Sequence, residues 1–366
     1  MNQAPGLLVV VSGHGFGHAT RMAALLTALR RRRPDLRLAV CTACPHRVFL
    51  PPAAPPGIQI HDTVFDFGMR QTNSVTLDLP GTLAGLAELA ERTPEQQRMF
   101  NELLAAFRPA AVLADIPAAP LAWAAAAGLP AIGISNFTWD VIYAELGRVH
   151  AGFLPHAAEQ AAWYARADAL LRLPFGPAPR AFNTVVDIPL LARRVTGDRS
   201  AIRRLLGLSA HDRIIVLSFG GFAMAAVRNF ARSFPADWQF LSWSQLPAPF
   251  PGRLTVLDAE SSMPHEAVTA AADIVIGKPG YGTVSECLAA QTKFLYVPRP
   301  DYPECAPLTD GVERHGVARS IPAADFMAGR WHGHIAALLA DDRPWPALRL
   351  DGADVAAAEI CRRSGW

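Results

Sequence analysis

The stretch Asp273-Ile-Val-Ile-Gly-Lys-Pro-Gly-Tyr-Gly-Thr-Val-Ser-Glu-Cys-Leu-Ala289 decides the fold, because it reads as a short buried strand that turns directly into a helix. Residues 273 to 276 are too few and too β-branched for a helix, and the glycines and the proline that follow break regular structure. Such a turn presents backbone N–H groups, here those of residues 281 to 284, to an anion that the helix dipole also favours. Lys278 adds a positive charge beside it. The stretch therefore predicts a strand, turn and helix that hold a diphosphate group.

Glu286 lies one helical turn after the glycines. A carboxylate at this place can accept hydrogen bonds from two neighbouring hydroxyls, such as those of a ribose diol. A Walker P-loop is excluded, because here the lysine precedes the glycines and no Gly-Lys-Ser/Thr ends the turn. The alternative is an ordinary strand-to-helix turn whose glycines only permit positive φ angles.

The composition indicates a globular chain with room for two domains. It has 366 residues, of which 51% are hydrophobic and 18% charged. The net charge of +2 argues against a nucleic-acid-binding protein that relies on a broad basic face.

Three further features favour a cytoplasmic protein. The opening apolar run, residues 7 to 11, is too short for an export signal, and no run approaches the roughly twenty apolar residues of a membrane span. The five cysteines are an odd number, which favours reduced thiols. Cys41 and Cys44 have the spacing of a redox or zinc pair, but no second pair completes a tetrahedral site, so we interpret them as incidental thiols and expect no metal.

Strands and helices alternate in both halves of the chain. The pattern predicts, in the first half, strands at 7–11, 36–41, 110–114, 131–135 and 169–173, an extended segment at 58–65, and helices at 19–32, 83–107 and 120–127. In the second half it predicts strands at 214–218, near 240, at 254–257, 273–276 and 294–297, and helices at 199–206 and 264–271. Apolar strands alternating with helices indicate parallel, doubly wound sheets.

A segment rich in proline and arginine, residues 186 to 197, separates the two halves. We therefore expect an α/β protein of two Rossmann-like domains, 1–190 and 191–345, that face each other across a cleft, with a C-terminal helix at 346–366 that returns to the first domain. The ligand is expected between the carboxyl ends of both sheets.

The loop Gly13-His-Gly-Phe-Gly-His18 follows the first predicted strand. It fails the dinucleotide fingerprint, because His18 occupies the place of the third glycine and no acidic residue ends the second strand. A neutral imidazole at His18, or secondarily at His14, could take a proton from an attacking hydroxyl, and Asp115 at the end of a neighbouring strand could orient it. The alternatives are a histidine bonded to backbone at the helix start and an aspartate that caps a helix.

Asn136, Trp139 and Asp140 follow the strand that ends at Ser135. They are expected to shape the pocket of an acceptor. A capped helix with a packed indole explains them equally well.

At these residues the chain resembles a GT-B glycosyltransferase over its whole length. The loop from Gly13 to His18, with Gly15, Phe16 and Gly17, is similar to the glycine-rich loop of the peptidoglycan N-acetylglucosaminyl transferase family. Plant small-molecule glycosyltransferases use a histidine at this place, held by an aspartate, which implies catalytic roles for His18 and Asp115. The stretch from 272 to 286 resembles the donor motif of these families, so that Glu286 is implied to bind the ribose.

A closer likeness is to the N-terminal, glycosyltransferase-like half of plant L-arabinokinases. It rests on Gly-His-Gly-Phe-Gly-His-Ala-Thr-Arg at 13–21, Ser-Asn-Phe-Thr-Trp-Asp-Val-Ile-Tyr at 135–143, Asp-Ile-Pro-Leu at 187–190, Gly-Lys-Pro-Gly-Tyr-Gly-Thr-Val-Ser-Glu at 277–286 and Arg-Pro-Asp-Tyr at 299–302. The phosphate loop of their kinase half is absent, so the resemblance implies sugar-nucleotide binding and not sugar phosphorylation.

The chain departs from the best-understood transferases in two places. Lys278 replaces an arginine or serine, and Asp301 and Glu304 replace the pair of an acid and a glutamine that contacts the donor sugar. The usual donor rules therefore do not transfer. The residues expected to bind the donor are Gly220, Gly221, Met263, Lys278, Gly280, Tyr281, Gly282, Thr283, Glu286, Asp301 and Glu304.

The predicted function is transfer of a sugar from a nucleotide-diphosphate sugar, with UDP the expected nucleotide, to a hydroxyl or amine of an unknown acceptor. Inversion at the anomeric carbon is expected, without a metal or cofactor, because main-chain amides and Lys278 can stabilise the leaving diphosphate. Two other classes stay open: an epimerase that converts the sugar nucleotide without an acceptor, and a sensor that binds it without reaction.

Overall fold

The chain divides into two compact units. A computed structural model describes residues 4–72, 76–193, 195, 197–219, 230, 233–246, 250–258 and 263–366. Unit 1 comprises Met1–Arg70, Leu77–Leu191 and Arg349–Trp366, and unit 2 comprises Gln71–Thr76 and Ala192–Leu348. Each unit is built on one parallel sheet.

The sheet of unit 1 has seven strands in the order β3-β2-β1-β4-β5-β6-β7. Their bounds are β1 Gly6–Val11, β2 Arg37–Cys41, β3 Ile58–His61, β4 Ala111–Asp115, β5 Ala131–Ser135, β6 Ala169–Arg172 and β7 Val185–Asp187. The central strands β1, β4 and β5 are buried along their whole length, because helices cover both faces of the sheet. This explains why these strands are continuously apolar in sequence.

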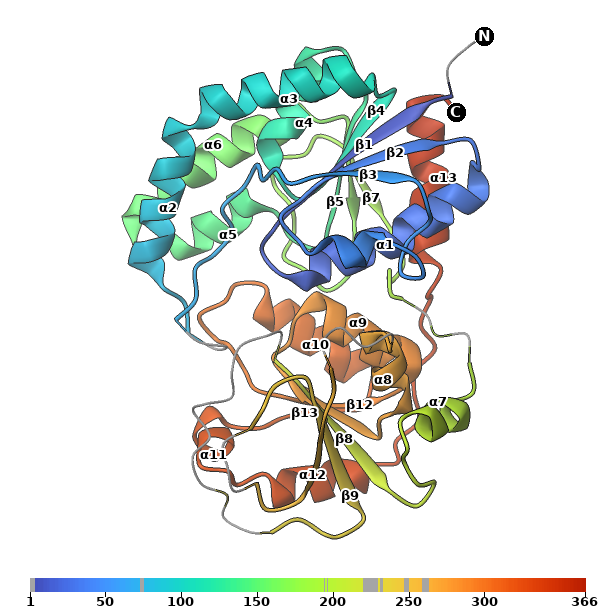
Figure 1. Ribbon diagram of the computed structural model, residues 1–366. Coiled ribbons are helices and arrows are strands. Elements are labelled where there is room, and N and C mark those ends of the chain that lie inside the picture. The colour runs from blue at the N-terminus through green and yellow to red at the C-terminus, as the bar shows by residue number, and fades with distance from the viewer. Residues whose placement is uncertain are drawn as a thin grey trace. The chain divides into compact units, whose positions relative to one another are not determined.

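The helices of unit 1 lie on both sides of that sheet (Figure 1). They are α1 Phe16–Arg32, α2 Leu79–Glu91, α3 Thr93–Phe107, α4 Ala118–Ala126, α5 Trp139–Leu146, α6 Leu154–Tyr164 and α13 Gly352–Ser364, with short 3₁₀ turns η1 His46–Phe49 and η2 Ala151–Phe153. The last helix, α13, packs against α1. The chain therefore returns to unit 1 after unit 2 is complete.

The sheet of unit 2 has six strands in the order β10-β9-β8-β11-β12-β13. Their bounds are β8 Arg213–Ser218, β9 Trp238–Ser242, β10 Arg253–Val256, β11 Ile274–Gly277, β12 Lys293–Tyr296 and β13 Ala318–Ser320. The helices are α7 Arg199–Leu205, α8 His265–Ala271, α9 Tyr281–Ala290, α10 Cys305–His315, α11 Ala323–Met327 and α12 His332–Leu339. One face of the sheet packs on α12 in an apolar core, and α8, α9 and α10 cover the other face (Figure 1).

Both units thus have the doubly wound α/β architecture that the alternation predicts, with three local differences. The single helix expected at 83–107 is two helices, because α2 ends at Glu91 and Pro94 stands in the first turn of α3, where its missing N–H costs nothing. Helix α6 is not among the predicted elements, and α5 corresponds to the helix given as the alternative explanation of Asn136, Trp139 and Asp140. Residues 185–187, expected in part to be linker, form the edge strand β7.

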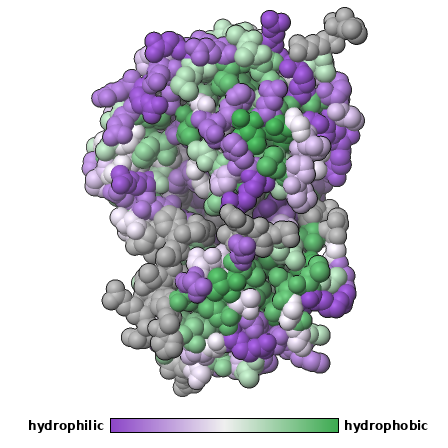
Figure 2. Space-filling model, in the orientation of Figure 1, coloured by the Kyte–Doolittle hydropathy of each residue, from purple (hydrophilic) through white to green (hydrophobic). Residues whose placement is uncertain are grey.

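Within the part of the chain that the structure describes, no helix combines the length and apolar character needed to cross a membrane. Figure 2 shows hydrophilic side chains spread over much of the visible face of unit 1.

All five cysteines are buried free thiols, and burial raises the pKa of the Cys41 thiol to about 12. The pair Cys41 and Cys44 is therefore present as two separate thiols.

Candidate functional site

In unit 1, the structure brings His18 and Asp115 together at the carboxyl edge of the sheet. Asp115 is the last residue of β4 and pairs in register with Val11, the last residue of β1. The loop after β1 leads straight into α1, which carries His18 in its first turn. His18 Nδ1 lies 2.8 Å from Asp115 Oδ1, and the two residues are 7% and 0% exposed. The aspartate is thus in place to orient the imidazole.

Arg21 binds the same carboxylate. Its Nε donates to Asp115 Oδ2 at 2.6 Å and its Nη2 to Asp115 Oδ1, while Nη1 donates to Asn136 Oδ1 at 2.8 Å. Arg21 Nη2 also lies 3.0 Å from His18 Nδ1. Arg21 is itself buried, so the site is a closed cluster of one imidazole, one guanidinium and one carboxylate.

The electrostatics of this cluster keep Asp115 ionised. Burial of Asp115 opposes its charge, but Arg21 and His18 outweigh burial and hold the pKa of Asp115 below its usual range. An ionised Asp115 accepts a hydrogen bond from His18 Nδ1–H, which leaves Nε2 as the basic nitrogen of the ring. The arrangement can therefore supply a general base.

His14 has a different environment from His18. Its Nδ1 accepts the backbone N–H of Met69 at 3.1 Å, and its ring contacts Trp139 edge-on at 5.7 Å. A side chain at Gly68, where φ is 74°, would come within 2.6 Å of the His14 ring. The loop that carries His14 turns at the next residue, Gly15, whose φ of 116° favours glycine. His14 is thus fixed as part of the loop.

The residues expected to line an acceptor pocket are largely interior. Trp139 is the first residue of α5 and is buried in the core. Its indole stacks on the Tyr143 ring at 5.3 Å and donates its Nε1–H to Asp66 Oδ2 at 3.1 Å. Burial raises the pKa of both Asp66 and Asp140. The packed indole favours a structural role for Trp139, whereas Asn136 belongs to the cluster through Arg21.

In unit 2, the glycine-rich turn lies at the carboxyl edge of the sheet. Gly277 ends β11 and pairs in register with Ser218, the last residue of β8. Helix α9 begins at Tyr281, and its N-cap residue, Gly280, has no side chain that could cap it. A Cβ atom added at Gly280 would meet no described residue within 4 Å. This geometry suits an anion held by main-chain amides.

Two cations flank this turn. Burial and the neighbouring Arg299 guanidinium lower the pKa of the Lys278 ammonium to about 8. Arg299 is 5% exposed and its guanidinium lies 4.4 Å above the Tyr302 ring, with no hydrogen-bond partner for Nε or Nη2 among the described residues. Burying an unpaired guanidinium is costly, so a bound anion would relieve it.

Glu286 is buried in unit 2 and held by two side chains. Its Oε1 accepts hydrogen bonds from Arg193 Nη2 at 2.6 Å and Nε at 3.1 Å, and its Oε2 lies 2.6 Å from His265 Nδ1. Arg193 also forms an ion pair with Glu266 at 2.7 Å. A carboxylate has about four lone-pair sites. Arg193 and His265 use three of them, so that, among the described residues, Glu286 has room for about one hydroxyl unless Arg193 moves. Its ribose role stays a prediction.

The other expected donor residues differ in their setting. Met263 packs against the small cluster of Ile202, Ala267 and Ala271, while Asp301 is exposed and Glu304 precedes α10. Gly282 and Thr283 are partly exposed in the first turn of α9. Gly220 and Gly221 lie outside the described residues.

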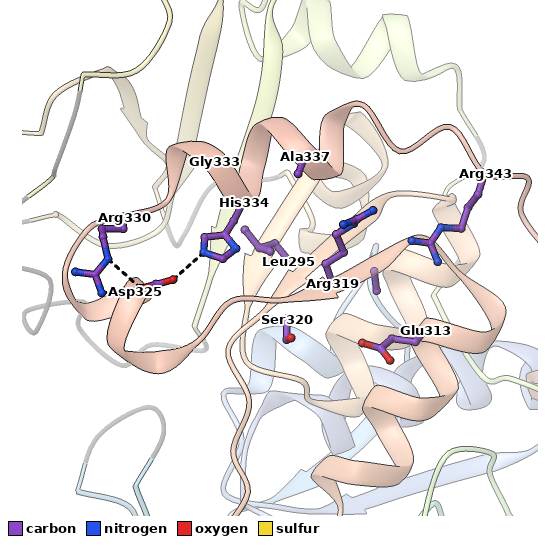
Figure 3. A pocket seen from close by; sticks show the side chains of 11 residues that line it. Leu295, Glu313, Arg319, Ser320, Asp325, Arg330, Gly333, His334, Ala337 and Arg343 are labelled. Carbon is purple, nitrogen blue, oxygen red and sulfur yellow. Dashed lines mark hydrogen bonds and ion pairs between the residues drawn. The ribbon is translucent and has the colours of Figure 1, made fainter.

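One hollow on the described surface of unit 2 contains none of the predicted site residues. It encloses about 960 Å³ near β12, β13 and α12, and three arginines, Arg319, Arg330 and Arg343, line it (Figure 3). Arg330 and His334 both bind Asp325, and Arg319 and Arg343 both bind Asp341. Because the carboxylates of Asp325 and Asp341 already neutralise these cations, an anion would gain little by binding in the hollow.

Sequence reasoning missed four ionisable residues of the two sites: Arg21, Arg193, His265 and Arg299. Arg21 had a usable signal, since it stands three residues after His18 and therefore on the same side of the helix. Arg193 lies in the segment expected to be a linker, and its partner Glu286 is 93 residues away. No local pattern indicates such a pair.

Glu286 should make the stability of unit 2 depend on pH. Although burial opposes its charge, Arg193 and His265 lower the pKa of Glu286 to about 2, against 4.5 for an ordinary glutamate. The difference corresponds to about 3 kcal/mol, which is fully present above pH 4.5 and is lost as the pH falls toward 2. Calorimetry should therefore find Glu286→Gln less stable than the wild type at pH 7, with the gap closing on acidification. Asp342→Asn, at a carboxylate with 91% exposure, is the control; an equal gap at all pH values would contradict the assignment.

Comparison with solved structures identifies the fold. The chain matches a UDP-glucosyltransferase from Polygonum tinctorium that glucosylates indoxyl, with a TM-score of 0.60 and 15% identity over 99% of both chains. It matches Phytolacca americana UGT2, solved with UDP-2-fluoro-glucose and pterostilbene, with a TM-score of 0.59 and 11% identity over 99% of this chain and 100% of that one. Acinetobacter baumannii MurG gives a TM-score of 0.51 and 14% identity over 98% and 99%. The chain has the GT-B fold of these glycosyltransferases.

A comparison of sequences adds one relative to these structural matches. The chain is 30% identical over 329 residues to an L-arabinokinase of Arabidopsis thaliana. The matched region covers 88% of this chain. It spans about a third of the length of that relative, 31%. No family model matches the chain.

Proposed function

We propose that this chain is a glycosyltransferase that moves a sugar from a nucleotide-diphosphate sugar, with UDP as the expected nucleotide, to a hydroxyl or amine with inversion. The observation that carries the proposal is the buried bond of 2.8 Å between His18 and Asp115 at the carboxyl edge of unit 1. The solved neighbours that contain a UDP-sugar analogue support the donor class.

Unit 2 would bind the donor. The uncapped N-terminus of α9 offers main-chain amides to the diphosphate, and Lys278 and Arg299 add positive charge beside it. Such preorganised donors stabilise the negative charge that develops on a leaving diphosphate. Because they are built into the chain, we propose that transfer needs no metal ion, and activity should persist in excess EDTA.

Unit 1 would activate the acceptor. His18 Nε2 takes the proton of the acceptor hydroxyl while its oxygen attacks the anomeric carbon, and the bond from that carbon to the diphosphate breaks with its electron pair on the diphosphate. Asp115 remains ionised and stabilises the imidazolium that forms. A single displacement of this kind inverts the anomeric centre.

A sugar-nucleotide sensor is the second candidate. Arg21 occupies both oxygens of Asp115, which weakens the support that this carboxylate can give to a charged His18. A sensor would bind the sugar nucleotide and leave it intact in the presence of any acceptor. An epimerase on the same fold would convert the donor with no acceptor present.

A thermal-shift screen over nucleotides and nucleotide sugars is expected to find the donor. A cognate ligand at about a hundred times its dissociation constant adds roughly 2.7 kcal/mol of stability. The stabilising sugar nucleotide is then incubated with candidate acceptors and its products are separated by mass. Stabilisation without turnover would favour the sensor, and no stabilisation by any nucleotide would overturn the proposal.

A further inference from the structure

Four side chains of unit 2 form one continuous hydrogen-bonded line. Arg193 binds Glu286 at 2.6 Å, Glu286 Oε2 lies 2.6 Å from His265 Nδ1, and His265 Nε2 lies 2.8 Å from Ser218 Oγ. The residues come from the segment before α7, from α9, from α8 and from the end of β8. We call this line the relay. It ends on a hydroxyl that the function proposed above leaves without a role.

The relay fixes which way its hydrogens point. Glu286 is ionised, so it only accepts, and His265 Nδ1 must carry the hydrogen of that bond. In a neutral imidazole, Nε2 is then the acceptor, and Ser218 must donate its only hydrogen to it. Ser218 Oγ consequently offers just lone pairs to its other side. It would repel an oxyanion.

Protonation of His265 reverses this polarity. Both ring nitrogens of an imidazolium donate, so Nε2–H donates to Ser218 Oγ and the Ser218 hydrogen is released for another acceptor. The negative charge of Glu286, 2.6 Å away, stabilises this charged ring. Ser218 becomes a hydrogen-bond donor for an oxyanion only when His265 has taken up a proton.

The strand end that carries this hydroxyl lies next to the turn where the diphosphate is expected. Ser218 pairs in register with Gly277, which directly precedes Lys278 and the glycine-rich turn. A Cβ atom at Gly277 would come within 2.3 Å of the Ser218 carbonyl oxygen, so these strand ends are in close contact. Resting on the donor site proposed above, we propose that a phosphoryl oxygen of the donor binds Ser218 and that this binding is coupled to uptake of a proton by His265.

The groups around His265 permit this coupling. Glu286 faces it from α9 and Ser218 from β8, Trp243 stacks on its ring at 4.8 Å, and Glu266 and Thr269 are on its own helix. The only cation in this line, Arg193, is on the far side of Glu286 and is shared with Glu266. The His265 side chain is 28% exposed, so that protons can reach it.

Titration calorimetry at pH 7.0 tests the coupling. UDP-glucose is titrated into the full chain in two buffers of different ionisation enthalpy, which gives the protons taken up on binding. UDP is titrated for its affinity alone, because its terminal phosphate has a second pKa of about 6 and exchanges its own proton near pH 7. At this pH only about a tenth of Lys278, with a pKa of about 8, lacks its proton, so lysine contributes little. We expect a net uptake of protons on binding by the wild type that exceeds the uptake by the His265→Gln variant.

Three variants separate the relay from general binding. His265→Gln should bind with an uptake below about 0.2 proton, because a glutamine does not titrate. Ser218→Ala leaves the His265–Glu286 pair in place and should weaken binding about tenfold and abolish uptake, since it removes one charge-assisted hydrogen bond. His211→Gln, at an exposed histidine of the same unit, is the matched control and should behave like the wild type.

The outcomes distinguish the two proposals. Nucleotide binding without proton uptake, or equal uptake by the wild type and His265→Gln, overturns the relay and leaves the donor site standing. Unchanged affinity and uptake in Ser218→Ala also overturns it. If a folded chain binds neither nucleotide, the donor site as proposed falls, and the relay falls with it.

Discussion

His18→Ala is expected to lower the turnover number by about two to four orders of magnitude, because a positioned general base contributes about that much to proton transfer. The donor should bind as before, since its proposed contacts lie in unit 2. Turnover is measured with the sugar nucleotide that the thermal-shift screen identifies, and donor binding by calorimetry.

His46→Ala is the matched control for this variant. His46 is a histidine of the same unit with an exposed side chain that bonds the exposed Asp62 at 2.7 Å. Its loss should leave turnover within about twofold, as expected of an exposed pair worth less than about 1 kcal/mol. If His18→Ala turns over at the wild-type rate, His18 is not the base.

Asp115→Ala is expected to cost about 3–5 kcal/mol of the free energy of unfolding of unit 1, because it leaves the Arg21 guanidinium buried without its carboxylate. A loss confined to the hydrogen bond with His18 would cost only about 1 kcal/mol. Denaturant unfolding followed by fluorescence measures the difference.

A double variant shows whether the buried charge causes this loss. Arg21→Met combined with Asp115→Ala removes both charges and should recover a large part of the stability, since a buried ion pair can often be replaced by apolar groups at little cost. The recovered protein should still be inactive. Asp62→Ala, which breaks an exposed pair, should stay within about 1 kcal/mol. Equal losses in the single and double variants would contradict the role of Arg21.

The sheets of both units could be predicted from sequence because their strands are buried on both faces. Strands β4 and β11 are apolar runs that end in Asp115 and Gly277, and the apolar run of β1 is followed directly by Ser12, so their positions and their carboxyl edges are visible in the sequence. The helices were harder to place. Pro94 divides the stretch 83–107 into α2 and α3, a break that periodicity alone does not show.

The contact between His18 and Asp115 was predictable because Asp115 ends β4 and His18 follows the short loop after β1. His18 and Asp115 stand at neighbouring strand ends, and the topology of a parallel sheet brings such ends to one edge. The partners that bind them were not predictable in the same way. Arg21 stands on the same side of its helix as His18, which is a local signal, but its bond to Asp115 joins residues 94 positions apart. This bond and the bond of His265 to Glu286, 21 residues away, depend on tertiary packing that leaves no periodic trace.

The buried thiols make the two units separately observable. Cys41 lies in β2 of unit 1 and Cys287 follows Glu286 in α9 of unit 2. Burial raises the pKa of both thiols, so almost no thiolate exists at neutral pH unless the surrounding structure opens. The rate at which an alkylating reagent modifies each cysteine therefore reports the local opening of its own unit. A nucleotide that binds at α9 would slow the labelling of Cys287, and the labelling rate of Cys41 would serve as the internal reference.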